Sequence, residues 1–314
     1  MRTGLLVFVL FLVGKQPLNA QPDTVRIGAY LISLHDIDFH ENEYTARFWL
    51  WLQYSNPNFD FKQQLDIPNA KTIDKPEEIA DSINGKPWVM LKMKCTMKEN
   101  WKVHNFPFDK QHAYIQIENS IYDNKTLFFK PDKLGSTYAK DLGVDGWKIS
   151  NFKVSTGNNG YETSFGDTRV KKQFSEFATF VIELDLEREA FGLFMKLFSG
   201  MYIAFLISLI SFAPKPEELE PRFGLPVGGL FAAVGNKYII DSLLPESSSF
   251  TLVDTLHMIT FLGIFSILLL SAISLRLHDA GKKEACAKVN YTGSRSIIAV
   301  YFLLNMFFIA LAIV

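Results

Sequence analysis

The chain has little of what would mark a disulfide-stapled scaffold, a nucleic-acid-binding protein or a soluble enzyme. It holds only 2 cysteines in 314 residues, and its formal net charge is -1. So few cysteines exclude a disulfide framework, and a near-zero charge without a basic patch argues against polyanionic partners. The sequence shows no metal-ligand spacing, no glycine-rich phosphate loop, no nucleophile with a base and no internal repeat. We therefore expect no catalytic residue, metal, cofactor or nucleic-acid partner, and hence no enzyme.

Long apolar runs are what the chain has instead. It is 48% hydrophobic, and four runs in its last third are each about as long as the ~20 residues that cross a bilayer as a helix. These runs are 191–212, 223–244, 252–275 and 296–314. Charged residues crowd the region Asp23–Arg188 before them. The sequence therefore predicts a polar domain over 21–190 and a four-helix transmembrane domain over 191–314.

The first twenty residues, 1–20, have the form of a secretory signal peptide. Arg2 supplies the charged start, Leu5–Val13 the apolar core and Asn19-Ala20 the small-residue exit. The apolar core is too short to span a bilayer, which disfavours the alternative of a retained anchor. Cleavage leaves the N-terminus outside, and four crossings return the C-terminus to the same side.

The loop charges agree with this topology. The loop after the third span is basic, whereas the link Pro245–Thr251 before it has no Lys or Arg, as the positive-inside rule requires. Cys95 then lies outside and Cys286 inside, so the two should not pair. We expect a multi-pass protein of a bacterial inner (plasma) membrane, with the polar domain and the C-terminus in the periplasm.

The polar domain has the period of β-strands. One strand, Tyr44–Tyr54, alternates, with Trp49 and Trp51 on one face and Phe48, Leu50 and Leu52 on the other. Further strands are expected at Val25–Ile32, Gln111–Ile117, Trp147–Val154 and Phe177–Leu186. Turn residues separate them, at Asn56–Asn58, Asp123-Asn124 and Gly157–Gly160, and Pro76–Ile83 could be a short helix. Many short strands with turn signals predict an antiparallel, immunoglobulin-like β-sandwich.

The stretch Asn105–Gln111 contains the run Phe106-Pro107-Phe108-Asp109, which alone reads as a turn with two buried aromatics. In front of a β-sandwich and four spans, it resembles the signature loop of pentameric ligand-gated ion channels, the Cys-loop receptor superfamily. The order and spacing of other segments support the resemblance: Ala29–Asp38, Gly146-Trp147, Leu186–Arg188, Leu244-Pro245 and Thr251–Asp254. Glu99 and Ala113 stand where animal receptors carry two half-cystines. The chain therefore looks like a prokaryotic member without that disulfide.

The resemblance implies a homopentamer in a lipid bilayer and a gating interface between the domains. Asp38, Asp109 and Arg188 are expected to meet there, beside the signature-loop residues and Pro245. An arginine between two carboxylates forms bidentate, partly desolvated bonds. The alternative is that each is a solvated surface charge of negligible energy.

The resemblance also implies a small-molecule site lined by aromatic residues between subunits. Candidates are Tyr122, Tyr161 and Phe165, the last two in a capping loop over Gly157–Asp167, with Trp49 or Trp51 from the neighbouring subunit. Core packing is the alternative for each. The usual Trp-x-Pro wall is missing between Asn58 and Trp101, and Tyr54 replaces a tryptophan.

The ligand is thus an unknown small molecule or a proton. A proton would act on His35, His104 or His112, because imidazole titrates near neutral pH. Three unclustered histidines are more often ordinary surface or core residues.

The second span is the expected pore helix. Placed without gaps against Leu244-Pro245, its lining face reads Glu220, Gly224, Gly228, Phe231, Gly235, Tyr238 and Ser242. Five copies of Glu220 would attract cations at the inner mouth. Five copies of Phe231 would form an apolar gate, and the alternative is that Phe231 is an ordinary aromatic residue facing lipid or another helix. Arg222 lies close to Glu220 in the sequence and argues against a purely acidic inner mouth. Pro226 weakens the helix, because proline cannot donate a backbone hydrogen bond. The glycines of the second span would either widen a pore or let helices pack tightly with no pore. Gly200, in the first span, is another small residue that lets helices approach closely.

These observations predict a homopentameric ligand-gated ion channel that conducts cations. The alternative is a non-conducting pentameric periplasmic sensor or scaffold with the same fold. That alternative is favoured by the missing Trp-x-Pro wall of the aromatic site and by the glycine-rich second span.

Overall fold

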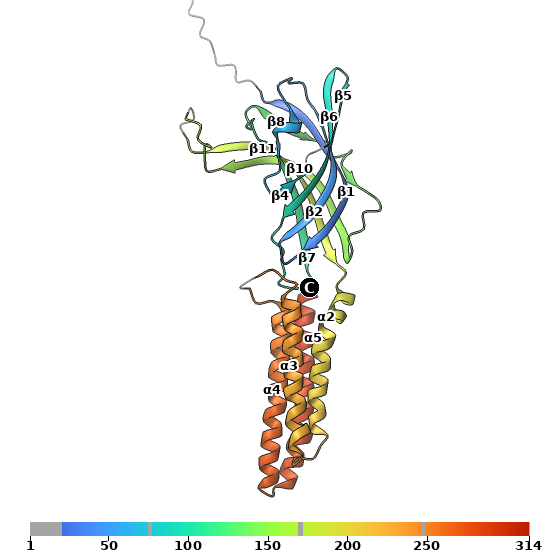
Figure 1. Cartoon of the computed structure of the whole chain (residues 1–314), viewed down its shortest axis with the longest axis vertical. Helices are drawn as coiled ribbons and strands as arrows, with labels where there is room; N and C mark the ends of the chain where they lie inside the picture. Colours follow the sequence, from blue (N-terminus) through green and yellow to red (C-terminus); the bar gives the residue numbers. More distant parts are fainter. Residues whose placement is uncertain (1–20, 75–76, 169–171, 247–248, 314) are drawn as a thin grey trace, which may run out of the picture.

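The computed structural model describes residues 21–74, 77–168, 172–246 and 249–313. The expected signal peptide, 1–20, lies outside the described residues. Two β-sheets form the upper part of the molecule, and a bundle of long helices extends below them (Figure 1). The architecture is a β-sandwich followed by four candidate transmembrane helices.

The larger sheet has seven strands in the order β4-β6-β2-β1-β8, with β5 paired to β6 and β9 paired to β1. Its strands are β1 (Asp23–Asp38), β2 (Glu43–Gln53), β4 (Ala70–Ile73), β5 (Glu77–Ile83), β6 (Lys86–Lys98), β8 (Leu127–Pro131) and β9 (Thr137–Tyr138). The smaller sheet has the order β10-β11-β7-β3. Its strands are β3 (Leu65–Asp66), β7 (Lys110–Asn119), β10 (Trp147–Tyr161) and β11 (Ser175–Arg188), and the short helix α1 is Phe61–Gln64.

The alternation predicted for β2 is present. Phe48, Leu50 and Leu52 are fully buried in the sandwich core, whereas Trp49 and Trp51 lie half-buried on the opposite face. Burying one aliphatic or aromatic side chain contributes about 1.5–3 kcal/mol. The core therefore holds the domain together without a disulfide, and Cys95 and Cys286 are both free and buried.

The helix considered for Pro76–Ile83 is wrong, because Glu77–Ile83 is the strand β5, antiparallel to β6. Asn84 and Gly85 both have positive φ, 54° and 74°, and join Ile83 to Lys86. An Asn-Gly pair of this kind makes the two-residue hairpin turn whose twist matches the flanking strands. The Asn84-Gly85 turn therefore makes this segment a strand of a β-hairpin and not a helix.

The turn expected at Gly157–Gly160 is also wrong. These residues continue β10 and pair with β11, Gly157 opposite Thr179 and Gly160 opposite Glu176. A Cβ on Gly160 would lie 2.9 Å from the tip of the exposed Phe174 ring, so the glycine lets this ring pack close to β10. The polar residues belong to a strand extended beyond the core, where the apolar alternation used for prediction is lost.

The helices are α2 (Ala190–Leu209), continued by η1 (Ile210–Phe212), then α3 (Leu219–Asp241), α4 (Leu252–Asp279) and α5 (Lys283–Ile313). All four long helices are long and apolar enough to cross a membrane. α5 begins at Lys283 rather than 296, because hydropathy detects only the apolar part of a helix whose first three turns are polar.

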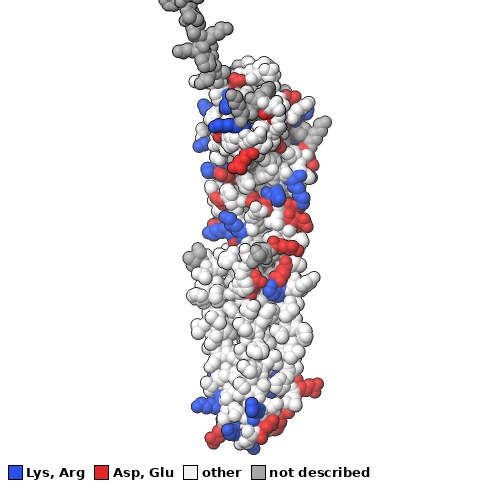
Figure 2. Space-filling model, turned by 90° about the vertical axis from the view of Figure 1, so that its left-hand side faces the viewer, with Lys and Arg blue, Asp and Glu red and all other residues white. Residues whose placement is uncertain are grey.

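The distribution of charged residues agrees with helices that cross a membrane. In Figure 2 the middle of the helical part is free of charged residues on the visible face, and charges return at its lower end. That end carries the turn between α4 and α5, and α5 then returns to the end of the bundle next to the sheets (Figure 1).

Candidate functional site

A buried ion pair lies where the sandwich meets the helices. Arg188 ends β11, two residues before α2, and donates to Asp109 through Nε (2.7 Å to Oδ1) and Nη2 (3.0 Å to Oδ2). The side chains are only 9% and 1% exposed. Gln111 Nε2 donates to the same carboxylate at 2.7 Å. Such a bidentate, desolvated pair holds its geometry tightly.

Three aromatic rings enclose the Arg188 guanidinium. Its Cζ lies 4.0 Å from the ring centroid of Trp147, 4.6 Å from that of Phe39 and 5.0 Å from that of Phe106. Each ring face attracts the cation. The pair is therefore built into the core rather than solvated, which removes the surface-charge alternative for Arg188 and Asp109.

Asp38 does not join this pair, so the expected three-residue cluster is wrong in this respect. Its Oδ1 accepts from the backbone N–H of Glu41 at 2.9 Å, and its backbone carbonyl accepts from Trp101 Nε1 at 2.9 Å. The register of β1 against β2 is irregular between His35 and Asp38. The carboxylate therefore caps the β1–β2 turn instead of reaching Arg188.

The signature loop and the β1–β2 turn touch the helices directly. Phe108 packs on Phe194 of α2, with ring centroids 5.5 Å apart. The backbone N–H of Leu252, the first residue of α4, donates to the His104 carbonyl at 2.8 Å. His40 Nδ1 contacts the carbonyl of Leu244, next to Pro245, at 3.3 Å. Phe108 of the signature loop thus contacts α2, and Phe106 lies beside Arg188, while the gating role of Phe106, Pro107 and Phe108 stays a prediction.

The smaller sheet carries a cavity of about 1060 Å³ at its outer end. Tyr161, Phe165 and Phe177 form an aromatic triad on its wall, with centroid separations of 5.4, 5.9 and 6.2 Å. The Tyr161 hydroxyl donates to Glu118 Oε2 at 3.0 Å, and burial together with that carboxylate raises the pKa of Tyr161 to about 12. Glu118 is 3% exposed and also accepts from Gln116 at 2.6 Å.

The cavity combines aromatic faces with an excess of negative charge. Five carboxylates and two lysines line it. Sequence reasoning found Tyr161 and Phe165 but missed Phe177 and Glu118. Both positions follow from strand pairing: β11 pairs with β10 on one side and with β7 on the other, and this brings Phe177 of β11 and Glu118 of β7 to Tyr161.

The other ligand candidates do not line this cavity. Tyr122 packs on Phe59, with centroids 4.9 Å apart, and its hydroxyl donates to the Asn58 carbonyl at 3.3 Å. Trp49 lies under Lys92 Nζ, and Trp51 donates to Asp132 at 3.4 Å, both on the larger sheet.

The three histidines considered as proton sites are also dispersed. His35 Nδ1 contacts Asp36 at 2.8 Å and His112 Nδ1 contacts Asp185 at 2.7 Å. The hydrogen bond from His112 lowers the pKa of Asp185. His104 is exposed, and the three side chains do not form a cluster.

The expected pore face of α3 is exposed in the subunit. Phe231 is 73% and Tyr238 77% exposed, whereas the opposite face, including Ala233 and Ile240, is fully buried against other helices. A Cβ built on Gly224, Gly228 or Gly235 meets nothing within 4 Å, and Glu220 and Ser242 are exposed on the same side.

The glycines of α3 divide between the two alternatives. A Cβ on Gly229 would lie 2.2 Å from Ser208 Oγ, so this glycine packs α3 against α2. Those on the exposed face pack against nothing in the subunit. Pro226 lies inside α3 and is buried. Arg222 is fully buried, and its guanidinium donates to the Pro214 carbonyl at 3.2 Å and to Asn290 of α5.

A two-sheet β domain, followed by four membrane-length helices and joined to them through the signature loop, is the architecture of Cys-loop pentameric ligand-gated ion channels. The chain is 24% identical over 296 residues to the acetylcholine-gated chloride channel subunit acc-1 of Caenorhabditis elegans. The match covers 85% of this chain and 61% of the relative, so the chain spans about 61% of the relative's length. No protein-family model matches the chain.

The resemblance drawn from the motifs is confirmed, and the chain is related to the pentameric ligand-gated ion channels. It is a multi-pass membrane protein whose relative is a channel subunit and not an enzyme. The prokaryotic origin stays a prediction.

Proposed function

We propose that the chain forms a homopentameric ligand-gated ion channel with α3 lining the pore. The observation that carries the proposal is the two-sided character of α3. One face is buried against α2 and α4, and the other exposes Glu220, Phe231 and Tyr238 beside three glycines. A face with a carboxylate and glycines is poorly suited to lipid and suits a water-filled path. The relative's name, a channel subunit, supports the same function.

The proposed gate is a ring of Phe231 side chains, with Glu220 at the inner mouth. A narrow apolar ring closes a path by excluding water. Gating would pass from the ligand cavity through β10 and β11 to the Arg188–Asp109 pair, since Arg188 is the last residue of β11 and α2 begins at Ala190. The signature loop that holds Asp109 also contacts α2 and α4, through Phe108 and His104.

We propose cations as the conducted ions. Glu220 is exposed, whereas Arg222 is buried and bonded to Asn290, so the carboxylate is the charge that would face the path. Chloride is the second candidate, because the relative is a chloride channel. Reversal potentials in a salt gradient separate the two, and a Glu220→Gln variant that left a cation preference unchanged would remove Glu220 from selectivity.

The proposed ligand is a small organic cation that binds in the acidic aromatic cavity. Each well-placed ring contributes about 0.5–2 kcal/mol to binding a cation. Three rings and the buried Glu118 carboxylate stand at this wall. The relative's name, acetylcholine-gated, points to the same chemical class. The opposite wall would come from a neighbouring subunit, where Trp49 or Trp51 are the candidates.

Bilayer recording of the purified protein tests the function. Small organic cations should open currents, and Phe231→Ala should leave the channel open without ligand. If neither the unmodified protein nor the Phe231→Ala variant conducts current, the result would favour the non-conducting scaffold.

A matched thiol pair tests the lining. Gly228→Cys lies on the exposed face and Ala233→Cys on the buried face. A water-soluble thiol reagent should block the current through the Gly228→Cys variant and leave the current through the Ala233→Cys variant unchanged. Equal reactivity of the two cysteines would refute the assigned pore face.

The orientation follows from charge. We propose that the sandwich and the C-terminus lie outside and the α4–α5 turn inside, in a bacterial plasma membrane, because Arg276, Lys282 and Lys283 cluster at that turn.

A further inference from the structure

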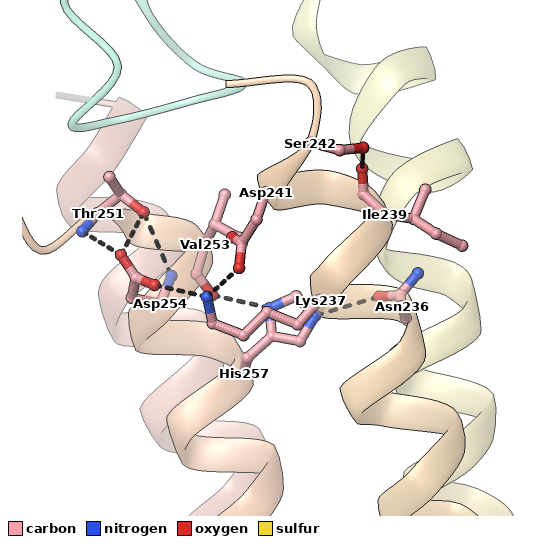
Figure 3. A network of polar contacts seen from close by, with 9 residues as sticks. All are labelled: Asn236, Lys237, Ile239, Asp241, Ser242, Thr251, Val253, Asp254 and His257. Atoms are coloured by element: carbon pink, nitrogen blue, oxygen red, sulfur yellow. Dashed lines mark hydrogen bonds and ion pairs between the residues drawn. The ribbon is translucent and has the colours of Figure 1, made fainter. Parts of the chain in front are cut away.

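A chain of hydrogen bonds crosses three helices at the end of the bundle nearest the sheets. Asn236 of α3 donates from Nδ2 to the carbonyl of Leu197 in α2 at 2.9 Å. Its Oδ1 lies 3.1 Å from Nε2 of His257 in α4, and His257 Nδ1 lies 2.8 Å from the Val253 carbonyl. Figure 3 shows Asn236 and His257 pointing toward one another. His257 is fully buried.

Both ends of this chain are acceptors. The carbonyls of Leu197 and Val253 have no proton to donate. Asn236 can satisfy the Leu197 carbonyl only with its amide nitrogen, and this orientation turns its amide oxygen to His257. His257 then faces an acceptor on each ring nitrogen.

A neutral imidazole has one N–H and one lone pair, so it leaves one of these contacts as two facing acceptors. Only the imidazolium, which has two N–H groups, satisfies both. Flipping Asn236 moves the conflict to Leu197 without removing it. The geometry of the chain is therefore that of a protonated His257.

The charges around the ring balance that proton. Lys237 of α3 contacts the carboxylates of Asp241 (2.6 Å) and Asp254 (2.9 Å), from α3 and α4 respectively (Figure 3). One cation and two carboxylates leave one negative charge, which an imidazolium would neutralise. The rings of Phe198 from α2 and Phe261 from α4 pack at 5.8 and 6.1 Å and carry no charge. Burying an imidazolium costs free energy, and the two acceptors together with the excess carboxylate reduce that cost.

The helices are shaped for this contact. A Cβ on Gly200 of α2 would lie 3.2 Å from Asn236 Nδ2, so the glycine leaves room for the amide to reach Leu197. Asp254 is held by Thr251, whose backbone N–H and hydroxyl donate to it at 2.9 and 2.8 Å.

We propose that His257 is a proton-binding site within the helix bundle, and that its protonated form clasps α3 to α2 and α4. Loss of the proton breaks one contact of the chain and frees α3 to move against its neighbours. The site is a property of one subunit and does not rest on the proposed channel function.

Nitrogen-15 NMR of the histidine-labelled full chain in lipid bilayers tests the site. The sequence has 6 histidines, and the His257 signal is assigned by its loss in His257→Gln. Between about pH 8 and about pH 5, the range in which histidines commonly titrate, that signal should change from one protonated nitrogen to two. A signal that stays the same throughout, neutral or charged, would overturn the proposal.

A variant of the acceptor tests the cause. Asn236→Leu should lower the ratio of imidazolium to neutral imidazole at one pH by about tenfold, because it removes a hydrogen bond to a charged group. Asn305→Leu removes another buried asparagine of the bundle, bonded to Tyr202 and Tyr301, and should leave the ratio unchanged. Equal effects of the two variants would show that general loosening, and not the Asn236 contact, sets the proton occupancy.

Where the protein conducts, the currents give a second readout. Their pH dependence over the same range should be lost in His257→Gln and kept in His104→Gln, an exposed histidine outside the chain. Silent bilayers would refute the channel function and leave the NMR test of the proton site standing, whereas a conducting His257→Gln with unchanged pH dependence would refute the clasp.

Discussion

Breaking the Arg188–Asp109 pair should destabilise the protein far more than an equal change at Asp38. Asp109→Asn keeps the shape of the side chain but leaves the buried Arg188 cation without its carboxylate. Removing one partner of a buried pair costs about 3–5 kcal/mol. The carboxylate is 1% exposed and accepts two guanidinium bonds, so solvent cannot replace it.

The expected shift is large enough to measure on the full chain. A domain of 150–250 residues loses about 2–4 °C of Tm per kcal/mol, so Asp109→Asn should lower Tm by about 6–20 °C. Thermal unfolding in detergent, followed by loss of the assembled species in size exclusion, gives this number.

Asp38→Asn is the matched control. Its Oδ1 accepts one exposed turn bond, from Glu41, and asparagine can still accept it. We expect a change of less than about 1 kcal/mol. A similar Tm loss in both variants, or none in Asp109→Asn, would refute the reasoning that the buried Asp109 carboxylate is needed to hold Arg188.

Three further predictions concern single positions. Gly229→Ala should impair folding or assembly, because a Cβ would lie 2.2 Å from Ser208 Oγ, whereas Gly228→Ala meets nothing within 4 Å and should stabilise α3 by up to about 1 kcal/mol; yields after purification compare them. Burial raises the pKa of Glu99 above its ordinary value of 4.5, and its Oε2 has no hydrogen-bond partner among the described residues. The folded protein therefore becomes less stable as the pH rises above 4.5 and this carboxyl has to ionise in a buried place. Glu99→Gln should therefore raise Tm at neutral pH and lose that advantage below about pH 4.5, and an advantage independent of pH would contradict this. Tyr161→Phe should weaken ligand binding only a few-fold, because the ring remains, and Tyr161→Ala much more, as direct binding to the purified protein would show.

The parts of the fold that follow local periodicity could be predicted from the sequence. The alternation of Phe48, Leu50 and Leu52 needs only neighbours two residues apart, and the four apolar runs need only their own composition. The signature loop was found because its order relative to the spans carries information. The pairing of Arg188 with Asp109 followed from that resemblance.

The remaining features depend on contacts between distant segments. Asp38 left the expected cluster because an irregular register in β1 directs it into a turn. Glu118 and Phe177 line the cavity only once β7, β10 and β11 are paired. His257 and Asn236 lie on different helices, and Gly200 on a third decides that they meet. No spacing along one segment reveals such a contact.

The turn between α4 and α5 has a practical consequence for control of the protein. α4 ends at Asp279 and α5 begins at Lys283, and Gly281 has a φ of 72° that lets the chain reverse at once. This link of three residues leaves no space for a folded insert at the end of the bundle away from the sheets. A regulator acting from that side would find only short links, the basic α4–α5 turn and the α2–α3 link, whose Glu217 pairs with His278 at 3.2 Å.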